Sequence, residues 1–210
     1  PYVYVHKLGT LRHVILSKDS ELKEIGTKAF YYNNQLDSMA FSHQIKSIGS
    51  SAYENCQSLK SVIIQSDSLC SIGQSAFKNC DMMKTLVLKS DSLASLPSEL
   101  AYGCDSLRNV SLLLPKLTKI PSHAFASCKN LGTITLPLAI ETVQSSAFYS
   151  SNIDSICFNP QLRTIESEAF AYVGRLKKLL LPTGLQTIAD NAFQSCRDLN
   201  EIRISSSVRK

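Results

Sequence analysis

The chain has 210 residues, is 44% hydrophobic and carries a formal net charge of +5, so it can build a sizeable core. It contains no apolar run of the roughly eighteen residues that a membrane span needs. No secretory leader is visible, but the chain starts at Pro1, so this says nothing about a parent protein. The mild basic charge is spread through the turns, whereas a nucleic-acid surface needs a stronger basic stripe with stacking aromatics.

An alanine followed by an aromatic residue recurs along the chain at nearly constant intervals. After Phe30 the steps are 23, 24, 24, 24, 23, 22 and 23 residues, and Leu100-Ala101 keeps the register without a ring. A fixed period in this range is typical of stacked supersecondary units, each too small to bury its own apolar side. The aromatic positions are Phe30, Tyr53, Phe77, Phe125, Phe148, Phe170 and Phe193.

Each unit also has aliphatic positions of constant type, and most units have a cysteine at one further position, where Asn33, Ser151 and Val173 stand in the others. Aliphatic residues stand five and eight residues before the ring, as Ile120 and Leu117 do before Phe125, and a leucine or methionine usually stands six residues after it. Cysteine stands three residues after the ring in four units and three residues after Ala101 in the unit that lacks the ring. Those cysteines are Cys56, Cys80, Cys104, Cys128 and Cys196.

A short apolar–polar alternation closes each unit and predicts a strand. Pro137 and Pro182 directly follow two of these runs, which suits a strand end because proline cannot donate to a ladder. The clearest runs are 62–64, 86–88, 110–112, 134–136, 156–158, 179–181 and 202–204, with less regular ones at 14–16 and 39–41. We therefore predict a right-handed solenoid with about nine parallel strands on one side and turns or short helical segments opposite.

The register runs without a linker or a charge block, which predicts a single domain over residues 1–210. Residues 1–13 form an N-terminal partial repeat or cap, residues 14–204 form the repeats, and residues 205–210 form a C-terminal tail.

The seven cysteines are predicted to be free thiols. Four of them are 24 residues apart at one position of the unit, so they should stack in a buried column, where free cysteine behaves as a small hydrophobe. Zinc sites need paired short spacings, which the chain lacks, and parallel stacked side chains seldom meet disulfide geometry. Cys70 and Cys157 lie off the column, and Cys157 falls at an outward strand position.

The sequence offers no catalytic constellation. The four histidines fall at unrelated phases of the unit, and none of the phosphate-binding, nucleophile-elbow, zinc-protease or dinucleotide motifs is present. We therefore predict no enzymatic activity, no cofactor and no metal site.

The unit I-x-x-x-A-F-x-x-C-x-x-L-x-x-I-x-L-P resembles the BspA-like class of leucine-rich repeats, best at 120–138 and 188–204. The resemblance covers about 11–204. It implies a leucine-rich repeat solenoid and a cell-surface or secreted location, as for bacterial surface proteins of gut and oral Bacteroidetes. Some family members are adhesins for host matrix proteins or other bacteria, and this implies a protein partner of that kind.

The leading functional hypothesis is therefore a non-catalytic protein-binding module. The alternatives are a spacer or stalk that displays another domain, and a regulator of an intracellular partner. The outward strand positions are apolar in the first half of the chain, and exposed apolar patches mark interaction sites. The predicted binding residues on this face are Ile63, Val87, Lys89, Ser111, Thr135, Lys178, Leu180 and Arg203.

Overall fold

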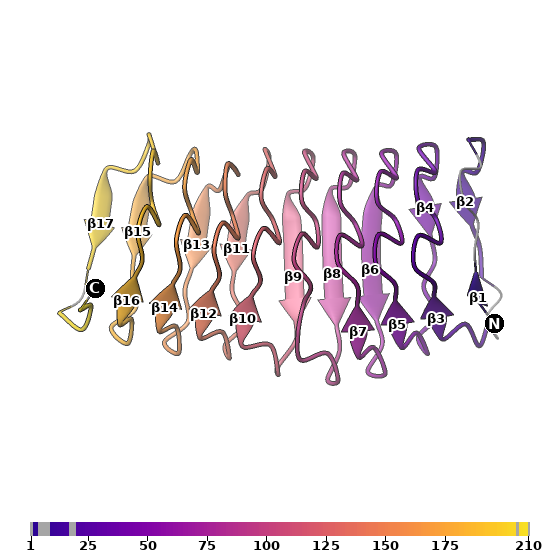
Figure 1. The fold of residues 1–210 in the computed structure, drawn as a ribbon, viewed down its shortest axis with the longest axis horizontal. Helices are drawn as coiled ribbons and strands as arrows, with labels where there is room; N and C mark the ends of the chain where they lie inside the picture. The colour runs from indigo at the N-terminus through magenta and orange to yellow at the C-terminus, as the bar shows by residue number, and fades with distance from the viewer. Residues whose placement is uncertain (1, 4–8, 17–19, 205, 210) are drawn as a thin grey trace.

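The computed structural model describes residues 2–3, 9–16, 20–204 and 206–209 as a solenoid that winds right-handed from one end of the molecule to the other (Figure 1). Each coil contributes one strand to a long ribbon and, with one exception, a two-residue strand to a second ribbon opposite it. None of the described residues is helical. Turns therefore fill the place where turns or short helical segments were predicted.

The long ribbon confirms the predicted row of strands, with nine strands among the described residues. It consists of four parallel ladders, β2–β4, β6–β8–β9, β11–β13 and β15–β17. In the earlier coils two strands are shorter than predicted, because the runs at 14–16 and 39–41 form only two-residue pairs. The strands are β2 (His13–Val14), β4 (Ser38–Met39), β6 (Ser61–Gln65), β8 (Thr85–Lys89), β9 (Asn109–Leu113), β11 (Thr133–Thr135), β13 (Ser155–Cys157), β15 (Lys178–Leu180) and β17 (Glu201–Arg203).

The second ribbon is made of two-residue strands that the sequence did not predict as strands. Each contains an aliphatic residue, such as Ile48, which is buried while its neighbour Ser47 is half-buried. The coil around Leu96 has no such strand, so this ribbon has two halves. They contain β1 (Tyr2–Val3), β3 (Glu24–Ile25), β5 (Ser47–Ile48), β7 (Ser71–Ile72), and then β10 (Lys119–Ile120), β12 (Thr142–Val143), β14 (Thr164–Ile165) and β16 (Thr187–Ile188).

The turn that carries the aromatic position joins coils through its own hydrogen-bond ladder. In the first complete turn, alternate N–H groups of Lys28, Phe30 and Tyr32 donate to carbonyls of the next coil at 2.9, 2.7 and 3.0 Å. Two residues of every such turn have positive φ, for example Lys28 at 57° and Tyr32 at 59°. A left-handed conformation costs an L-residue about 1–2 kcal/mol, so the hydrogen bonds and the ring buried beneath must offset this strain.

The predicted aromatic column is confirmed. Six of its seven rings are fully buried, and neighbouring rings stack with centroid separations such as 5.6 Å for Phe125–Phe148 and 5.1 Å for Phe148–Phe170. Phe193, in the final coil, is only partly buried. Leu100 and Ala101 interrupt the stack and are themselves fully buried. The rings thus form the central part of one hydrophobic core that runs along the solenoid.

Candidate functional site

Successive side chains of a strand point to opposite faces, so every second residue of the long ribbon points outward. All eight predicted binding residues lie in strands of this ribbon. Ile63, Val87 and Ser111 are direct neighbours in the β6–β8–β9 register. Ile63 is 51% exposed, whereas Val87 and Ser111 are half-buried. Lys178, Leu180 and Arg203 lie together on β15 and β17 instead.

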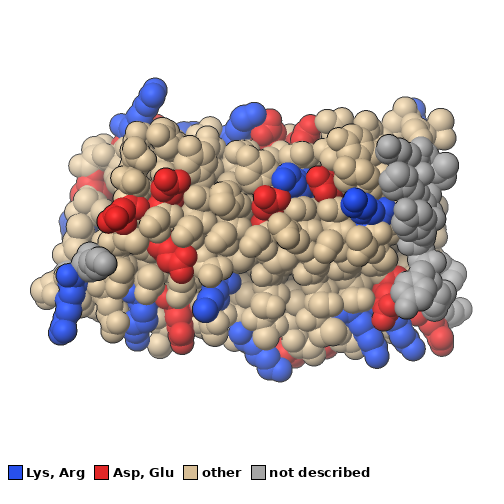
Figure 2. All heavy atoms as spheres, in the orientation of Figure 1, with Lys and Arg blue, Asp and Glu red and all other residues tan. Residues whose placement is uncertain are grey.

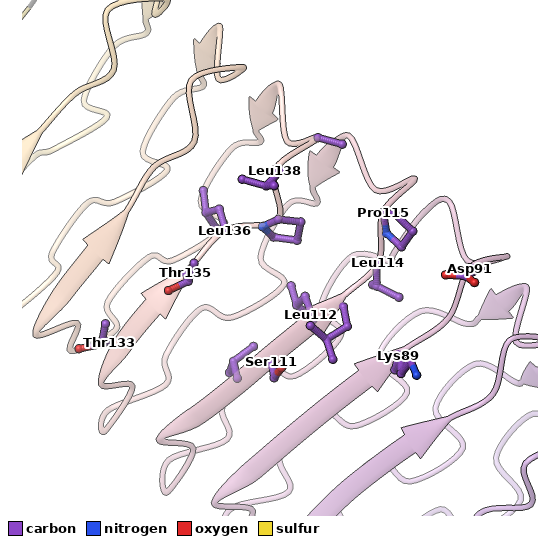
Figure 3. Close-up of a pocket in the computed structure, with 14 residues that line it drawn as sticks. Lys89, Asp91, Ser111, Leu112, Leu114, Pro115, Thr133, Thr135, Leu136 and Leu138 are labelled. Atoms are coloured by element: carbon purple, nitrogen blue, oxygen red, sulfur yellow. The ribbon is translucent and has the colours of Figure 1, made fainter.

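An open groove of about 910 Å³ lies where the ladder is interrupted between β9 and β11 (Figure 3). Strands β6, β8 and β9 pair over five residues each, whereas among the described residues no bridge joins β9 to β11. Three predicted residues, Lys89, Ser111 and Thr135, line this groove. The structure therefore brings part of the predicted set together and leaves the β15–β17 group outside.

The interruption has a local cause in chain length. Seven residues separate Val110 of β9 from Leu117, the first aliphatic position of the next unit, but only six separate Ile134 of β11 from the corresponding Ile140. Both Leu117 and Ile140 are buried, so the shorter connection must pull away from its neighbour to reach the core. Pro137, which follows Leu136 at the end of β11, also lacks the N–H that would extend a ladder.

Two strongly exposed leucines contribute to the apolar lining of the groove, and neither is among the predicted binding residues. Leu113 is 53% exposed at the end of β9, and Leu138 is 80% exposed in the turn after β11. Figure 3 shows Leu138 and Pro115 on neighbouring turns, with Leu114 next to Pro115. The sequence did contain a signal for Leu113, because the two preceding coils have the polar residues Gln65 and Lys89 at the same strand position.

The basic residues at the C-terminal end of the ribbon are paired. The Nζ of Lys178 lies 2.9 Å from Glu201 and the Nε of Arg203 lies 3.0 Å from the same carboxylate. The Lys178 hydrogen bond and charge, helped by Arg203, hold the pKa of Glu201 below its ordinary value. One of the two positive charges is therefore neutralised locally, which weakens this group as an anchor for an acidic partner.

The sequence profile described as the BspA type leucine rich repeat region matches residues 23–115 and 96–210, with six copies of the repeat. The chain belongs to the BspA-type leucine-rich repeat family. Leucine-rich repeats stack into solenoids whose extended surfaces serve as protein-interaction modules. A comparison with curated proteins gave no significant match.

Solved structures similar to this BspA-type chain share its fold. A leucine-rich repeat protein from Bacteroides ovatus is 20% identical with a TM-score of 0.68, over 99% of this chain and 61% of that chain. One from Eubacterium ventriosum is 19% identical with a TM-score of 0.58, over 85% of this chain and 41% of that one. A leucine rich cell surface protein from Faecalibacterium prausnitzii is 21% identical with a TM-score of 0.41, over 89% of this chain and 72% of that one. This chain thus spans only part of the first two proteins.

The cysteines of the BspA-type unit are structural. All seven are free, and four column cysteines are buried, while Cys196 in the last coil is half-buried. Each column thiol donates to a backbone carbonyl of the preceding coil, as Cys56 does to Phe30 at 3.0 Å. Burial raises the pKa of Cys56 to about 12, so its reactive thiolate is suppressed. Cys157 is exposed, as predicted, and so is Cys70.

Another pair of charged side chains lies in the turns that carry the aromatic position. The Nζ of Lys78 lies 2.7 Å from Glu99, which also accepts from the Ser75 hydroxyl at 2.9 Å. The hydrogen bond from Lys78 lowers the pKa of Glu99. Figure 2 shows charges of both signs spread over the face in view. Within the described part of the chain, no three His, Cys, Asp or Glu side chains converge to hold a metal ion.

The described residues also include no helix long and apolar enough to cross a membrane.

Proposed function

We propose that this chain is a non-catalytic protein-binding module whose binding surface is the outer face of the long ribbon, centred on the groove between β9 and β11. The observation that carries the proposal is the exposure of Leu113 and Leu138 at 53% and 80% in that groove. Concave sites with apolar walls and a few polar groups are where proteins bind ligands. The BspA-type repeat adds support because solenoids use extended surfaces of this kind.

The partner that we propose is a host matrix protein or another bacterial surface protein, contacted at the cell surface or after secretion. This location and this adhesive role rest on the resemblance to BspA-like proteins. Lys89, Ser111 and Thr135 line the groove, and Ile63 and Val87 extend the binding surface from it across β6 and β8. Lys178, Leu180 and Arg203 form its outer margin on β15 and β17.

The test is a surface-based affinity measurement against a panel of immobilised matrix proteins and bacterial surface proteins. The variant Leu113→Ser/Leu138→Ser should no longer bind the panel proteins that the wild type binds. It should keep its fold, because both side chains are exposed. The control Met82→Ser/Tyr172→Ser removes comparable exposed apolar side chains, 49% and 44% exposed, away from the groove. Equal loss in both variants, or none in either, would move the binding surface elsewhere, and a wild type that binds nothing would favour a spacer.

A further inference from the structure

A row of basic residues borders the outer face at the start of the long strands. Lys60, Lys84 and Arg108 directly precede β6, β8 and β9 and are all exposed. At the same position one coil earlier, Asp37 contacts Lys60 at 3.2 Å and the outward His13 at 2.8 Å. These contacts place the row at the margin of the outward side chains.

The charges of Lys84 and Arg108 are not used by the fold. Lys60 pairs with Asp37, but within the described residues the side chains of Lys84 and Arg108 have no ion pair and no hydrogen bond. Neighbouring coils lie about 4.8 Å apart, so these two cations are adjacent. The row ends at Gly132, which precedes β11. The unpaired positive charges of Lys84 and Arg108 therefore lie at the start of β8 and β9, beside the interruption between β9 and β11.

The opposite end of the same interruption is apolar and balanced in charge. The groove there is lined by one cation and one carboxylate, Lys89 and Asp91, together with Leu113 and Leu138. Five residues of strand separate Arg108 from Leu113, a distance of roughly 17 Å at 3.3–3.4 Å per residue. Between these ends the outward side chains of β9 are the uncharged Asn109 and Ser111.

We propose, resting on the binding function above, that the partner presents an extended acidic–apolar segment that lies along this interruption between β9 and β11. Its acidic residues lie over Lys84 and Arg108, and its bulky apolar residues fill the groove at Leu113 and Leu138. The separation of the two ends matches about five residues of extended chain. The uneven charge sets the direction, because an acidic group gains attraction only at the end where the cations are uncompensated.

The experiment measures fluorescence polarisation of a labelled synthetic peptide with two acidic residues, a polar spacer of about four residues and two leucines. The wild-type chain should bind it, and rising salt should weaken the binding because exposed charges are screened. Lys84→Glu/Arg108→Glu should weaken binding by roughly tenfold or more, and Leu113→Ser/Leu138→Ser should also weaken it. The control Lys46→Glu/Lys119→Glu makes the same change of net charge at two exposed lysines, one directly before β5 and one in β10, and should leave binding unchanged.

Three outcomes would overturn the inference. One is equal binding of a peptide whose spacer is cut to one residue, and another is equal binding of an acidic peptide without leucines, which would indicate a general polyanion surface. The third is the absence of peptide binding while a panel protein still binds through Leu113 and Leu138. That last result would leave the proposed binding function intact and remove only the acidic–apolar segment.

Discussion

Replacing Phe148 by alanine should strongly destabilise the solenoid, because this ring lies in the middle of the aromatic column. It is fully buried and stacks on Phe125 at 5.6 Å and on Phe170 at 5.1 Å. Truncating a buried phenylalanine to alanine costs about 3–5 kcal/mol. Two stacked neighbours add about 0.5–1.5 kcal/mol each beyond burial, so the loss should fall in the upper part of that range.

Urea unfolding followed by circular dichroism measures this loss as a shift in the transition midpoint at constant slope. Phe193→Ala is the matched control, because Phe193 is partly exposed and, among the described residues, stacks on one ring only, Phe170 at 5.4 Å. It should cost clearly less than Phe148→Ala. Equal costs for the two variants, or a cost below about 1 kcal/mol for Phe148→Ala, would refute the argument that the column is the centre of the core.

Three further predictions concern the thiols, the pH dependence and the domain organisation. Without reductant, a maleimide reagent should label Cys70 and Cys157 readily in the native state and all seven cysteines after denaturation; fewer than seven in the denatured protein would reveal disulfides. Since the pKa of Glu99 is lowered in the folded state, its ion pair stabilises the fold above the unfolded pKa of about 4.3 and this contribution is lost as pH falls through the folded value. Glu99→Gln should therefore lower the unfolding free energy by up to about 1 kcal/mol at pH 7 and by less at pH 3, and a pH-independent effect would contradict this. If residues 1–210 form a single domain, fluorescence and circular dichroism should report one coincident unfolding transition, whereas separate transitions would indicate independent blocks.

The inward half of this structure could be predicted from sequence because every coil repeats the same packing problem. The positions of Phe77, Cys80 and Leu86 keep their chemical type in most units, and all three residues are fully buried. The same regularity predicted a row of nine parallel strands. At the last coil the pattern is less informative, because Phe193 and Cys196 have no following coil among the described residues to cover them.

The features that the sequence did not predict depend on departures from the repeat. A two-residue strand such as Ser47–Ile48 gives too short an alternation to be recognised, and its pairing depends on the coils beside it. The positive φ of Lys28 or Glu168 is invisible in residue type, since neither is glycine or asparagine. The groove arises from one residue fewer after β11, which changes the backbone path without changing the repeating residues.

Hydrogen–deuterium exchange tests the binding surface most directly. It compares the free chain with the chain bound to one of the panel proteins for which binding has been measured. The account predicts that binding slows amide exchange in residues 109–115 and 133–139, which contain β9, β11 and the turns that line the groove. The turns that carry the aromatic positions should be unaffected, because they lie away from the long ribbon. Protection confined to those turns or to the second ribbon, with none at β9 and β11, would contradict the assignment of the outer face of the long ribbon as the binding surface.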